Sequence, residues 1–208
     1  MTSNDAATAI RVAVLGEWVP SRLADVLALQ RAEEPETAAS LIESDTAAPS
    51  DGSARGDFDF AFSPADLKWP GWVCEPLWHD TLAVAVAKRS HLLGYREVPS
   101  HELLKQPIIC AQSTADEPWQ VVVQRLCAEA PCARAQHVGA FDVAMTLVAA
   151  GYGITIAPSA RLAGYLCRGI AVRPLAGAPS IVMAYLLHRC KTLSEPQERF
   201  ARRARSMS

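Results

Sequence analysis

Residues 147–158, Leu-Val-Ala-Ala-Gly-Tyr-Gly-Ile-Thr-Ile-Ala-Pro, constrain the fold more than any other stretch of the chain. The helix-periodic apolar run that leads into them ends at Gly151, and glycine suits the left-handed residue that closes a helix. Gly153 then opens a short β-branched strand. Pro158 stops that strand, because proline cannot extend a ladder but favours the first turn of a helix. We therefore expect a helix–turn–strand–helix unit whose last helix points backbone N–H groups at whatever lies beyond the strand.

The remaining chain shows the same alternation of short apolar strands and amphipathic helices. The clearest helix is predicted over 119–130, where apolar residues recur every three or four positions. Ser194 and Gln197 have the spacing of a capping box, which predicts a final helix to about Arg205. Another helix is expected from Pro20 to near residue 35, a short one closes at 102–105, and 44–57 is expected to be a loop. Strands are predicted at 10–15, 38–43, 57–62, 73–77, 82–87, 107–110, 135–138, 154–157, 171–174 and 180–188.

This alternation predicts an α/β fold with mostly parallel sheets. The elements fall into two blocks, which indicates two lobes joined by a hinge of two long strands near 82–87 and 181–188. The expected boundaries are a tail at 1–8, a first lobe at 9–84 and 185–208, and a second lobe at 85–184.

Composition excludes several classes of protein. The 208 residues carry a net charge of −2, so the chain lacks the global basic surface of a nucleic-acid binder. The arginines at 199, 202, 203 and 205 are interpreted as a solvated helix face. No apolar run is long enough to span a bilayer, and residues 1–8 lack the pattern of a secretory signal. We expect a cytoplasmic protein whose six cysteines are reduced.

No pattern for catalysis, a metal or a cofactor stands out. Cys127, Cys132 and His137 match no common zinc spacing, and core thiols are the preferred interpretation. A redox switch through the two cysteines is the alternative. His79 beside Asp80 is interpreted as a turn or interface residue. The chain has no Gly-x-Ser-x-Gly elbow and no glycine-rich phosphate loop, so we expect no enzyme, no catalytic residue, no metal and no cofactor.

Several segments, in the right order, resemble the effector-binding domain of LysR-type transcriptional regulators. The Gly-x-Gly-Ile-x-x-x-Pro stretch at 151–158 carries the resemblance most clearly. Residues 10–15 look like the family's opening strand, and Gly56-Asp-Phe-Asp-Phe-Ala is similar to its Gly-x-x-Asp-Leu-Ala strand. Further similar segments are 75–86 followed by His91-Leu92, 98–107, 169–175 and 185–189, so that the resemblance covers about residues 9–205.

The resemblance implies a type-2 periplasmic-binding-protein fold with two Rossmann-like lobes. It implies a small-molecule effector in the cleft between the lobes, which would control transcription through the geometry of a dimer. It also implies homodimers or tetramers, with the helices at 20–34 and 119–130 as the preferred interfaces. Members of the family contact DNA through a winged helix-turn-helix domain, which these 208 residues do not include. Either the chain is the regulatory part of such a regulator, or it is a stand-alone domain that acts through a protein partner.

Two other functions fit less well. An enzyme on a related two-lobe fold, such as the short ATP phosphoribosyltransferase, needs an acidic residue before a Gly-Thr-rich phosphate loop, which is not found. A transport solute-binding protein would need an export signal, and none is evident.

Ligands of open α/β sheets bind beyond the carboxyl ends of strands, and several such ends are expected to converge in the cleft. The hydroxyls of Ser113 and Thr114 suit an anion, although they would equally suit the cap of a helix. The predicted effector-binding residues are Glu17, Trp18, Ser63, Gln112, Ser113, Thr114, Gly139, Phe141 and Pro158.

The first of these loops departs from the family pattern, which often has a Ser or Thr to hold an acid. Glu17 stands there instead, and its carboxylate repels an anion. Trp18 can stack on a ring or a cation. We therefore favour a ring-bearing or cationic effector over a small dicarboxylate. The alternative is that Trp18 plugs the pocket.

Overall fold

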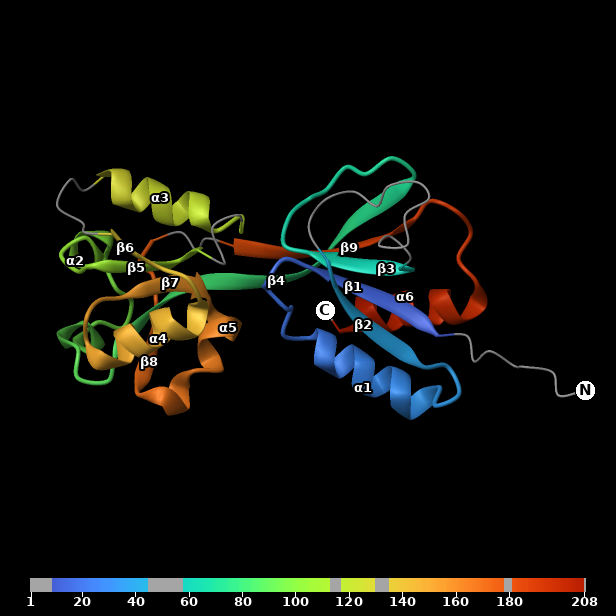
Figure 1. Cartoon of the computed structure of the whole chain (residues 1–208), viewed down its shortest axis with the longest axis horizontal. Coiled ribbons are helices and arrows are strands. Elements are labelled where there is room, and N and C mark those ends of the chain that lie inside the picture. The colour runs from blue at the N-terminus through green and yellow to red at the C-terminus, as the bar shows by residue number, and fades with distance from the viewer. Residues whose placement is uncertain (1–8, 45–57, 113–116, 130–134, 178–180, 208) are drawn as a thin grey trace, which may run out of the picture. The chain divides into compact units, whose positions relative to one another are not determined.

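The computed structural model describes residues 9–44, 58–112, 117–129, 135–177 and 181–207, arranged in two units (Figure 1). Unit 1 comprises Met1–Trp78 and Met183–Ser208, and unit 2 comprises His79–Val182. The chain crosses between them inside two strands, β4 (Trp72–Ala87) and β9 (Ile181–Arg189). The sequence had placed these crossings after residues 84 and 184.

Unit 1 is built on a sheet with the strand order β2-β1-β3-β9. Strand β1 pairs in parallel with β2 and β3, and β9 runs antiparallel to β3. Helices α1 and α6 pack against each other on this unit (Figure 1). The bounds are β1 Ile10–Leu15, α1 Leu23–Glu33, β2 Ala39–Ser44, β3 Phe60–Ser63 and α6 Glu195–Ser206.

Aromatic contacts fix α6 to the sheet of unit 1. The fully buried rings of Phe60 on β3 and Phe200 on α6 lie 4.9 Å apart, centroid to centroid. Phe62 stacks on Trp78 at 5.3 Å, and the Trp78 indole Nε1 donates a hydrogen bond of 3.1 Å to the carbonyl of Ala204. This buried bond satisfies a carbonyl in the last turn of α6, which has no partner within the helix.

A charged network links α6 to the end of α1. Arg203 donates to the carboxylates of Glu33 and Glu34 at 2.7 and 2.5 Å, and to Gln30 Oε1 at 2.7 Å. Hydrogen bonds from Arg199 and from Arg203 hold the pKa of Glu34 at about 2, below its ordinary value of 4.5. Arg203 is only 8% exposed, so the prediction of a solvated arginine face is wrong at this position.

Unit 2 contains two sets of paired strands. The second half of β4 pairs antiparallel with β7 on one side and β8 on the other, while β5 and β6 pair in parallel. The 3₁₀ turns are η1 His91–Gly94 and η3 Leu166–Arg168. The other bounds are α2 Ser100–Leu103, β5 Ile108–Ala111, α3 Gln120–Glu129, β6 Ala135–Val138, α4 Phe141–Ala150, β7 Thr155–Pro158, α5 Ser159–Ala163 and β8 Ile170–Pro174.

Two expectations about the strands need correction. The sheets are mixed instead of mostly parallel, because the crossing strands β4 and β9 run against their neighbours β7, β8 and β3. The segments predicted as separate strands at 73–77 and 82–87 form the single strand β4. The polar residues His79, Asp80 and Thr81 interrupt the apolar pattern but leave the backbone extended.

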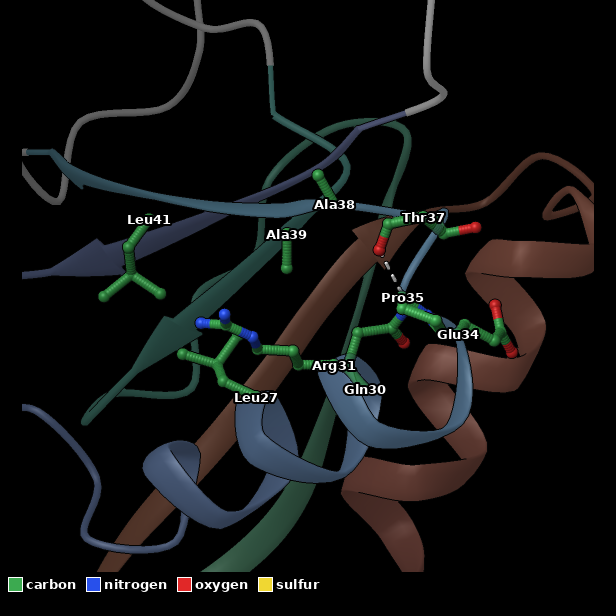
Figure 2. A pocket seen from close by; sticks show the side chains of 9 residues that line it. All are labelled: Leu27, Gln30, Arg31, Glu34, Pro35, Thr37, Ala38, Ala39 and Leu41. Carbon is green, nitrogen blue, oxygen red and sulfur yellow. Dashed lines mark hydrogen bonds between the residues drawn. The ribbon is translucent and has the colours of Figure 1, made fainter.

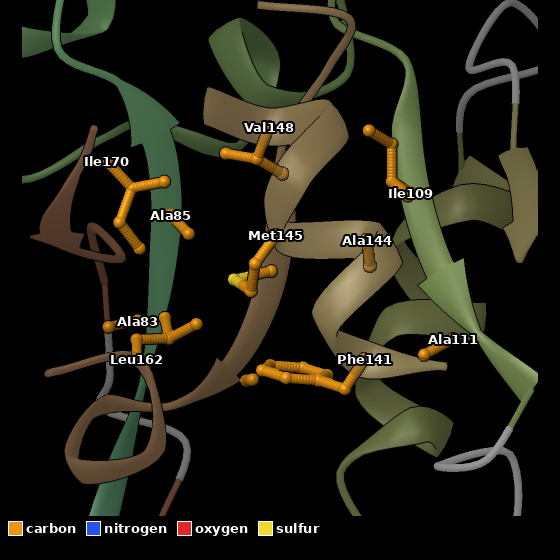
Figure 3. Packing of buried hydrophobic residues seen from close by; sticks show 11 residues of the cluster. Ala83, Ala85, Ile109, Ala111, Phe141, Ala144, Met145, Val148, Leu162 and Ile170 are labelled. Atoms are coloured by element: carbon orange, nitrogen blue, oxygen red, sulfur yellow. The ribbon is translucent and has the colours of Figure 1, made fainter. Parts of the chain in front are cut away.

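One face of α4 supplies much of the core of unit 2 (Figure 3). The buried residues Phe141, Ala144, Met145 and Val148 recur at helical spacing and point toward the neighbouring strands (Figure 3). The helix ends as the sequence predicts, at Gly151, whose φ of 86° lies in the left-handed region. Tyr152 N–H then donates to the carbonyl of Leu147 at 3.0 Å, which closes the last turn.

The second glycine of this turn has a different role. A Cβ on Gly153 would lie 2.3 Å from the carbonyl oxygen of Pro107. The same carbonyl accepts a 2.9 Å bond from Ile154 N–H, and Ile109 N–H donates to the carbonyl of Ile154 at 2.8 Å. Gly153 is therefore required by the close approach of β7 to β5. None of the helices in the described ranges is long and apolar enough to cross a membrane.

Candidate functional site

The predicted effector residues of unit 1 follow two neighbouring parallel strands. Val14 on β1 is the register partner of Phe62 on β3, so Glu17, which follows β1, and Ser63, the last residue of β3, belong to the same carboxyl edge. Glu17 is exposed, whereas Trp18 is only 4% exposed. A Trp18 side chain this well buried has to move before its ring face can stack on a ligand.

Ser63 is occupied in its own turn. The residue is 1% exposed, and its hydroxyl donates to the carbonyl of Ala65 at 2.9 Å and accepts from Ala65 N–H at 3.0 Å. A hydroxyl has one donor and two acceptor sites, so one acceptor site remains. Ser63 is thus arranged to fix the loop after β3, and it offers a ligand an acceptor and no proton.

The residues of unit 2 also follow one edge. Ala111 on β5 pairs with Val138 on β6, and Ile108 forms a parallel bridge with Ile154 just before β7. Gln112 and Gly139 therefore come directly after β5 and β6, and Pro158 is the last residue of β7, so all three lie at the carboxyl ends of neighbouring strands. Gln112 and Gly139 are exposed, and a Cβ on Gly139 would meet nothing within 4 Å. Ser113 and Thr114 lie outside the described residues.

Phe141 is buried at the start of α4 and is covered by two side chains. The guanidinium of Arg161 lies 4.1 Å from the centre of its ring, and the Tyr165 ring meets it edge-on at 5.5 Å. Phe141, 5% exposed, belongs to the core of unit 2, and its ring also contacts the Arg161 guanidinium at this edge. Sequence reasoning missed Arg161. The signal was its place in the helix that follows Pro158.

The helix expected after Pro158 has its N-terminus filled by a side chain of the same unit. Asp80 Oδ1 accepts from the Ser159 hydroxyl at 2.6 Å, and Asp80 Oδ2 accepts from Ala160 N–H at 2.9 Å. The donors expected to face a ligand therefore already bind a carboxylate. Asp80, the neighbour of His79 on β4, therefore caps α5.

A pocket of about 240 Å³ lies between α3 and the β5–β6 pair. Gln112, Gln120 and Val123 line it, together with Cys110 and His137, which are register partners on the two strands. Among the residues that the structure describes, no group of three His, Cys, Asp or Glu side chains could hold a metal ion. Cys132 and the side chain of Cys127 fall outside that part, so the predicted pair is not placed.

A larger pocket, of about 450 Å³, lies on unit 1 between α1 and β2 (Figure 2). Leu27 and Arg31 project from α1, and Leu41 projects from β2 (Figure 2). Gln30 Nε2 donates to the carbonyl of Thr37 at 3.2 Å and closes the floor beside the end of α1. None of the predicted effector residues that the structure describes lines this pocket.

Two α/β units, joined by two strands and each presenting loops after the carboxyl ends of its strands, define the class of type-2 periplasmic-binding-protein-like ligand-binding folds. Residues 3–207 match the family described as the LysR substrate binding domain, and the chain belongs to this family. This confirms the resemblance predicted from the sequence and the two-lobe α/β fold that it implied.

Solved structures of the family share the fold. The BenM effector binding domain with its effector benzoate is 21% identical, with a TM-score of 0.80 over 96% of this chain and 91% of that one. Full-length CbnR complexed with its target DNA is 17% identical, with a TM-score of 0.76 over 96% and 70%. Reduced OxyR from N. meningitidis is 19% identical, with a TM-score of 0.75 over 96% and 95%. None of the curated proteins matches this chain.

Proposed function

We propose that this chain senses a small-molecule effector in the cleft between its lobes and thereby controls transcription through the geometry of a dimer. The observation that carries the proposal is the family match over residues 3–207, since LysR substrate-binding domains are regulatory ligand-binding domains and not enzymes. Effector binding shifts such an equilibrium only if the effector binds one arrangement more tightly than the other.

We propose a ring-bearing or cationic effector over a small dicarboxylate. The exposed carboxylate of Glu17 at the edge of unit 1 supports this, because it repels a second anionic group. Arg161 at the edge of unit 2 suits one carboxylate, so a ring-bearing acid remains compatible. A small dicarboxylate has two anionic groups and no ring to stack on Trp18.

A thermal-shift screen with aromatic acids, aliphatic dicarboxylates, amino acids, amines and nucleosides tests this proposal. A ligand that binds only the folded chain stabilises it by about 2.7 kcal/mol at a hundredfold excess over its dissociation constant. We expect aromatic or cationic compounds to raise the melting temperature. A shift with small dicarboxylates alone would contradict the proposed effector class, and no shift with any compound would contradict the proposed sensing role.

Two charge variants test whether the ligand binds beside Glu17. Glu17→Gln should tighten the binding of an acidic ligand, because it removes a repelling carboxylate from the predicted site. Glu36→Gln removes an equally exposed charge in unit 1, after α1, and serves as the matched control. Equal ligand-induced shifts in the melting temperatures of the two variants would show that Glu17 does not face the ligand.

We propose further that the chain self-associates through α1 and β2. β2 is an edge strand of the sheet of unit 1, and Leu41 and Ile42 on it are 49% and 37% exposed. Beside it lies the pocket of Figure 2, with Leu27 on its α1 side. An unpaired strand edge with apolar side chains is an unfavourable surface to leave in water.

Sedimentation equilibrium tests this interface. Leu41→Asp should weaken dimerisation by about tenfold or more, since it places a charge where about 1.4 kcal/mol or more of apolar burial is lost. Val73→Asp changes a comparably exposed apolar residue on β4, which is 39% exposed, and should leave dimerisation unchanged. An identical response of both variants would assign the dimer to another surface.

A further inference from the structure

Unit 1 has a second pocket, of about 250 Å³, at the amino ends of its parallel strands. Arg11 near the start of β1 and Asp59 just before β3 line one side of it. Lys191 and Thr192, in the segment that joins β9 to α6, line the other side. The predicted effector residues Glu17 and Ser63 follow the opposite, carboxyl ends of the same strands. This pocket is therefore separate from the proposed effector site.

The pocket is basic. Among the residues that the structure describes, Arg11, Arg189 and Lys191 line it with one carboxylate, Asp59, so these three positive charges and one negative charge sum to a formal charge of +2. Within the described part of the chain, no ion pair engages Arg189 or Lys191.

Other arginines of this unit, by contrast, form ion pairs. Arg199, Arg203 and Arg205 each bind a carboxylate of unit 1. Two basic side chains that line a hollow without an ion-pair partner in the described residues, Arg189 and Lys191, indicate a site for an anion.

Arg189 is held in place by an aromatic ring. Its guanidinium carbon lies 4.6 Å from the centre of the Trp72 ring, and Trp72 packs in turn on Phe58 at 5.3 Å. A guanidinium stacked on a ring keeps its five N–H donors free in the plane of the group, which suits bidentate binding of a phosphate. Phe58 and Leu193 complete the lining with apolar surface.

The carboxylate of Asp59 has a structural role and forms no ion pair with Arg189 or Lys191 in the described part of the chain. Its Oδ2 accepts from Arg11 N–H at 2.8 Å, and its Oδ1 accepts from Gln197 Nε2 at 2.9 Å. Gln197 also caps α6 by accepting from Ser194 N–H at 2.9 Å. Asp59 therefore ties β3 to the start of α6, which fixes two walls of the pocket relative to each other.

The first turn of α6 carries two further described charges, Glu195 and Glu198. Glu195 pairs with Arg199 at 2.7 Å, and neither Glu195 nor Glu198 lines the pocket. The positive end of this 12-residue helix adds to the basic character of the site.

We propose that this pocket binds the phosphate group of a small phosphate monoester. Arg189 and Lys191 bind the phosphate oxygens, Thr192 offers a hydroxyl, and the organic part lies against Phe58 and Leu193. The formal charge of +2 matches the charge of a monoester at neutral pH, which is close to −2. Because the pocket lies at the other end of the sheet, the chain would respond to a phosphorylated compound independently of the effector.

Calorimetric titration with inorganic phosphate and with phenyl phosphate, at constant ionic strength, tests the proposal. Phenyl phosphate should bind more tightly than inorganic phosphate, because only the ester reaches the apolar lining. The double variant Arg189→Gln/Lys191→Gln should weaken binding of phenyl phosphate by about tenfold or more, as expected for the loss of charged hydrogen bonds. Arg202→Gln, which changes an exposed arginine of α6 that does not line the pocket, should bind as the unmodified chain does.

Amide chemical shifts provide the site-specific readout. Phenyl phosphate should shift the amide signals of Lys191 and Thr192 and leave that of Gly139, at the proposed effector edge, unchanged. Unaltered affinity in the double variant, or shifts confined to Gly139 and its neighbours, would overturn the proposal. Equal affinity for phosphate and phenyl phosphate would overturn the assignment to a monoester. The unmodified chain, the double variant and Arg202→Gln can all be studied at full length. The substituted side chains are exposed or half-buried, so we expect the variants to fold.

Discussion

Arg203→Ala should lower the free energy of unfolding of unit 1 by about 3 kcal/mol, the low end of the range for breaking a buried ion pair. Arg203 is nearly buried and donates to Glu33, Glu34 and Gln30. Its removal leaves donors and acceptors at the α1–α6 contact without partners. The low end applies because Arg199 still binds Glu34.

Urea unfolding followed by tryptophan fluorescence measures this loss. Four of the five tryptophans lie in unit 1, so a Trp119→Phe background restricts the signal to that unit. Arg202→Ala is the matched control on the exposed face of α6 and should change stability by no more than about 0.5 kcal/mol. A loss in Arg203→Ala no larger than in Arg202→Ala would show that the network contributes nothing.

The same network makes the free energy of unfolding of unit 1 depend on pH. The pKa of Glu34 is about 2 in the folded chain, against an ordinary value of 4.5. Because the folded pKa is the lower one, the stabilisation is fully present above about pH 4.5 and is lost as the pH falls toward 2. A pKa shift of this size corresponds to a contribution of roughly 3 kcal/mol to the free energy of unfolding. Glu34→Gln should remove most of the pH dependence of the free energy of unfolding of unit 1. If that free energy still fell equally steeply below about pH 4.5, Glu34 would not be the group responsible.

Gly153→Ala should destabilise unit 2 by about 3 kcal/mol, as for overpacking that forces the backbone to move. The added Cβ would lie 2.3 Å from the carbonyl oxygen of Pro107. Backbone at this point is fixed by the hydrogen bonds that Ile154 and Ile109 make across the β5–β7 contact. The atom in closest contact belongs to the backbone of Pro107, so the clash cannot be relieved by moving the end of a side chain.

Gly151→Ala is the matched control, two residues away in the same turn. Its Cβ would meet nothing within 4 Å, so only the left-handed φ of 86° opposes it, at a cost of about 1 kcal/mol. Hydrogen exchange of the Ile109 and Ile154 amides reports on the contact directly. These amides should exchange faster in Gly153→Ala than in Gly151→Ala, and equal protection would show that β7 does not need the close approach.

Local patterns predicted the elements that depend on neighbouring residues. The capping box of Ser194 and Gln197 is present with both of its hydrogen bonds, and Gly151 closes α4 in the left-handed region. The buried face of α4 also follows from helical spacing alone. Each of these features is decided by interactions within about one helical turn, which sequence spacing encodes.

The candidate site was predictable only in part. That its residues follow the carboxyl ends of neighbouring strands could be expected from strand order, and the register places Glu17 with Ser63, and Gln112 with Gly139, in this way. Two features of the site could not be expected from the sequence: the hydrogen bonds of the Ser63 hydroxyl within its own turn, and the position of Arg161 over Phe141. Each depends on where side chains point after packing.

The family, the two-lobe α/β fold and most of the helices and strands could be predicted from the amino-acid sequence, since periodicity, caps and turns act over a few residues. Which distant groups meet depends on how the chain packs in three dimensions. Asp80 caps a helix 80 residues later, and Arg203 binds Glu34 across 169 residues. Gly153 is needed because β7 passes close to β5, a constraint set by another strand's backbone and invisible in the local pattern.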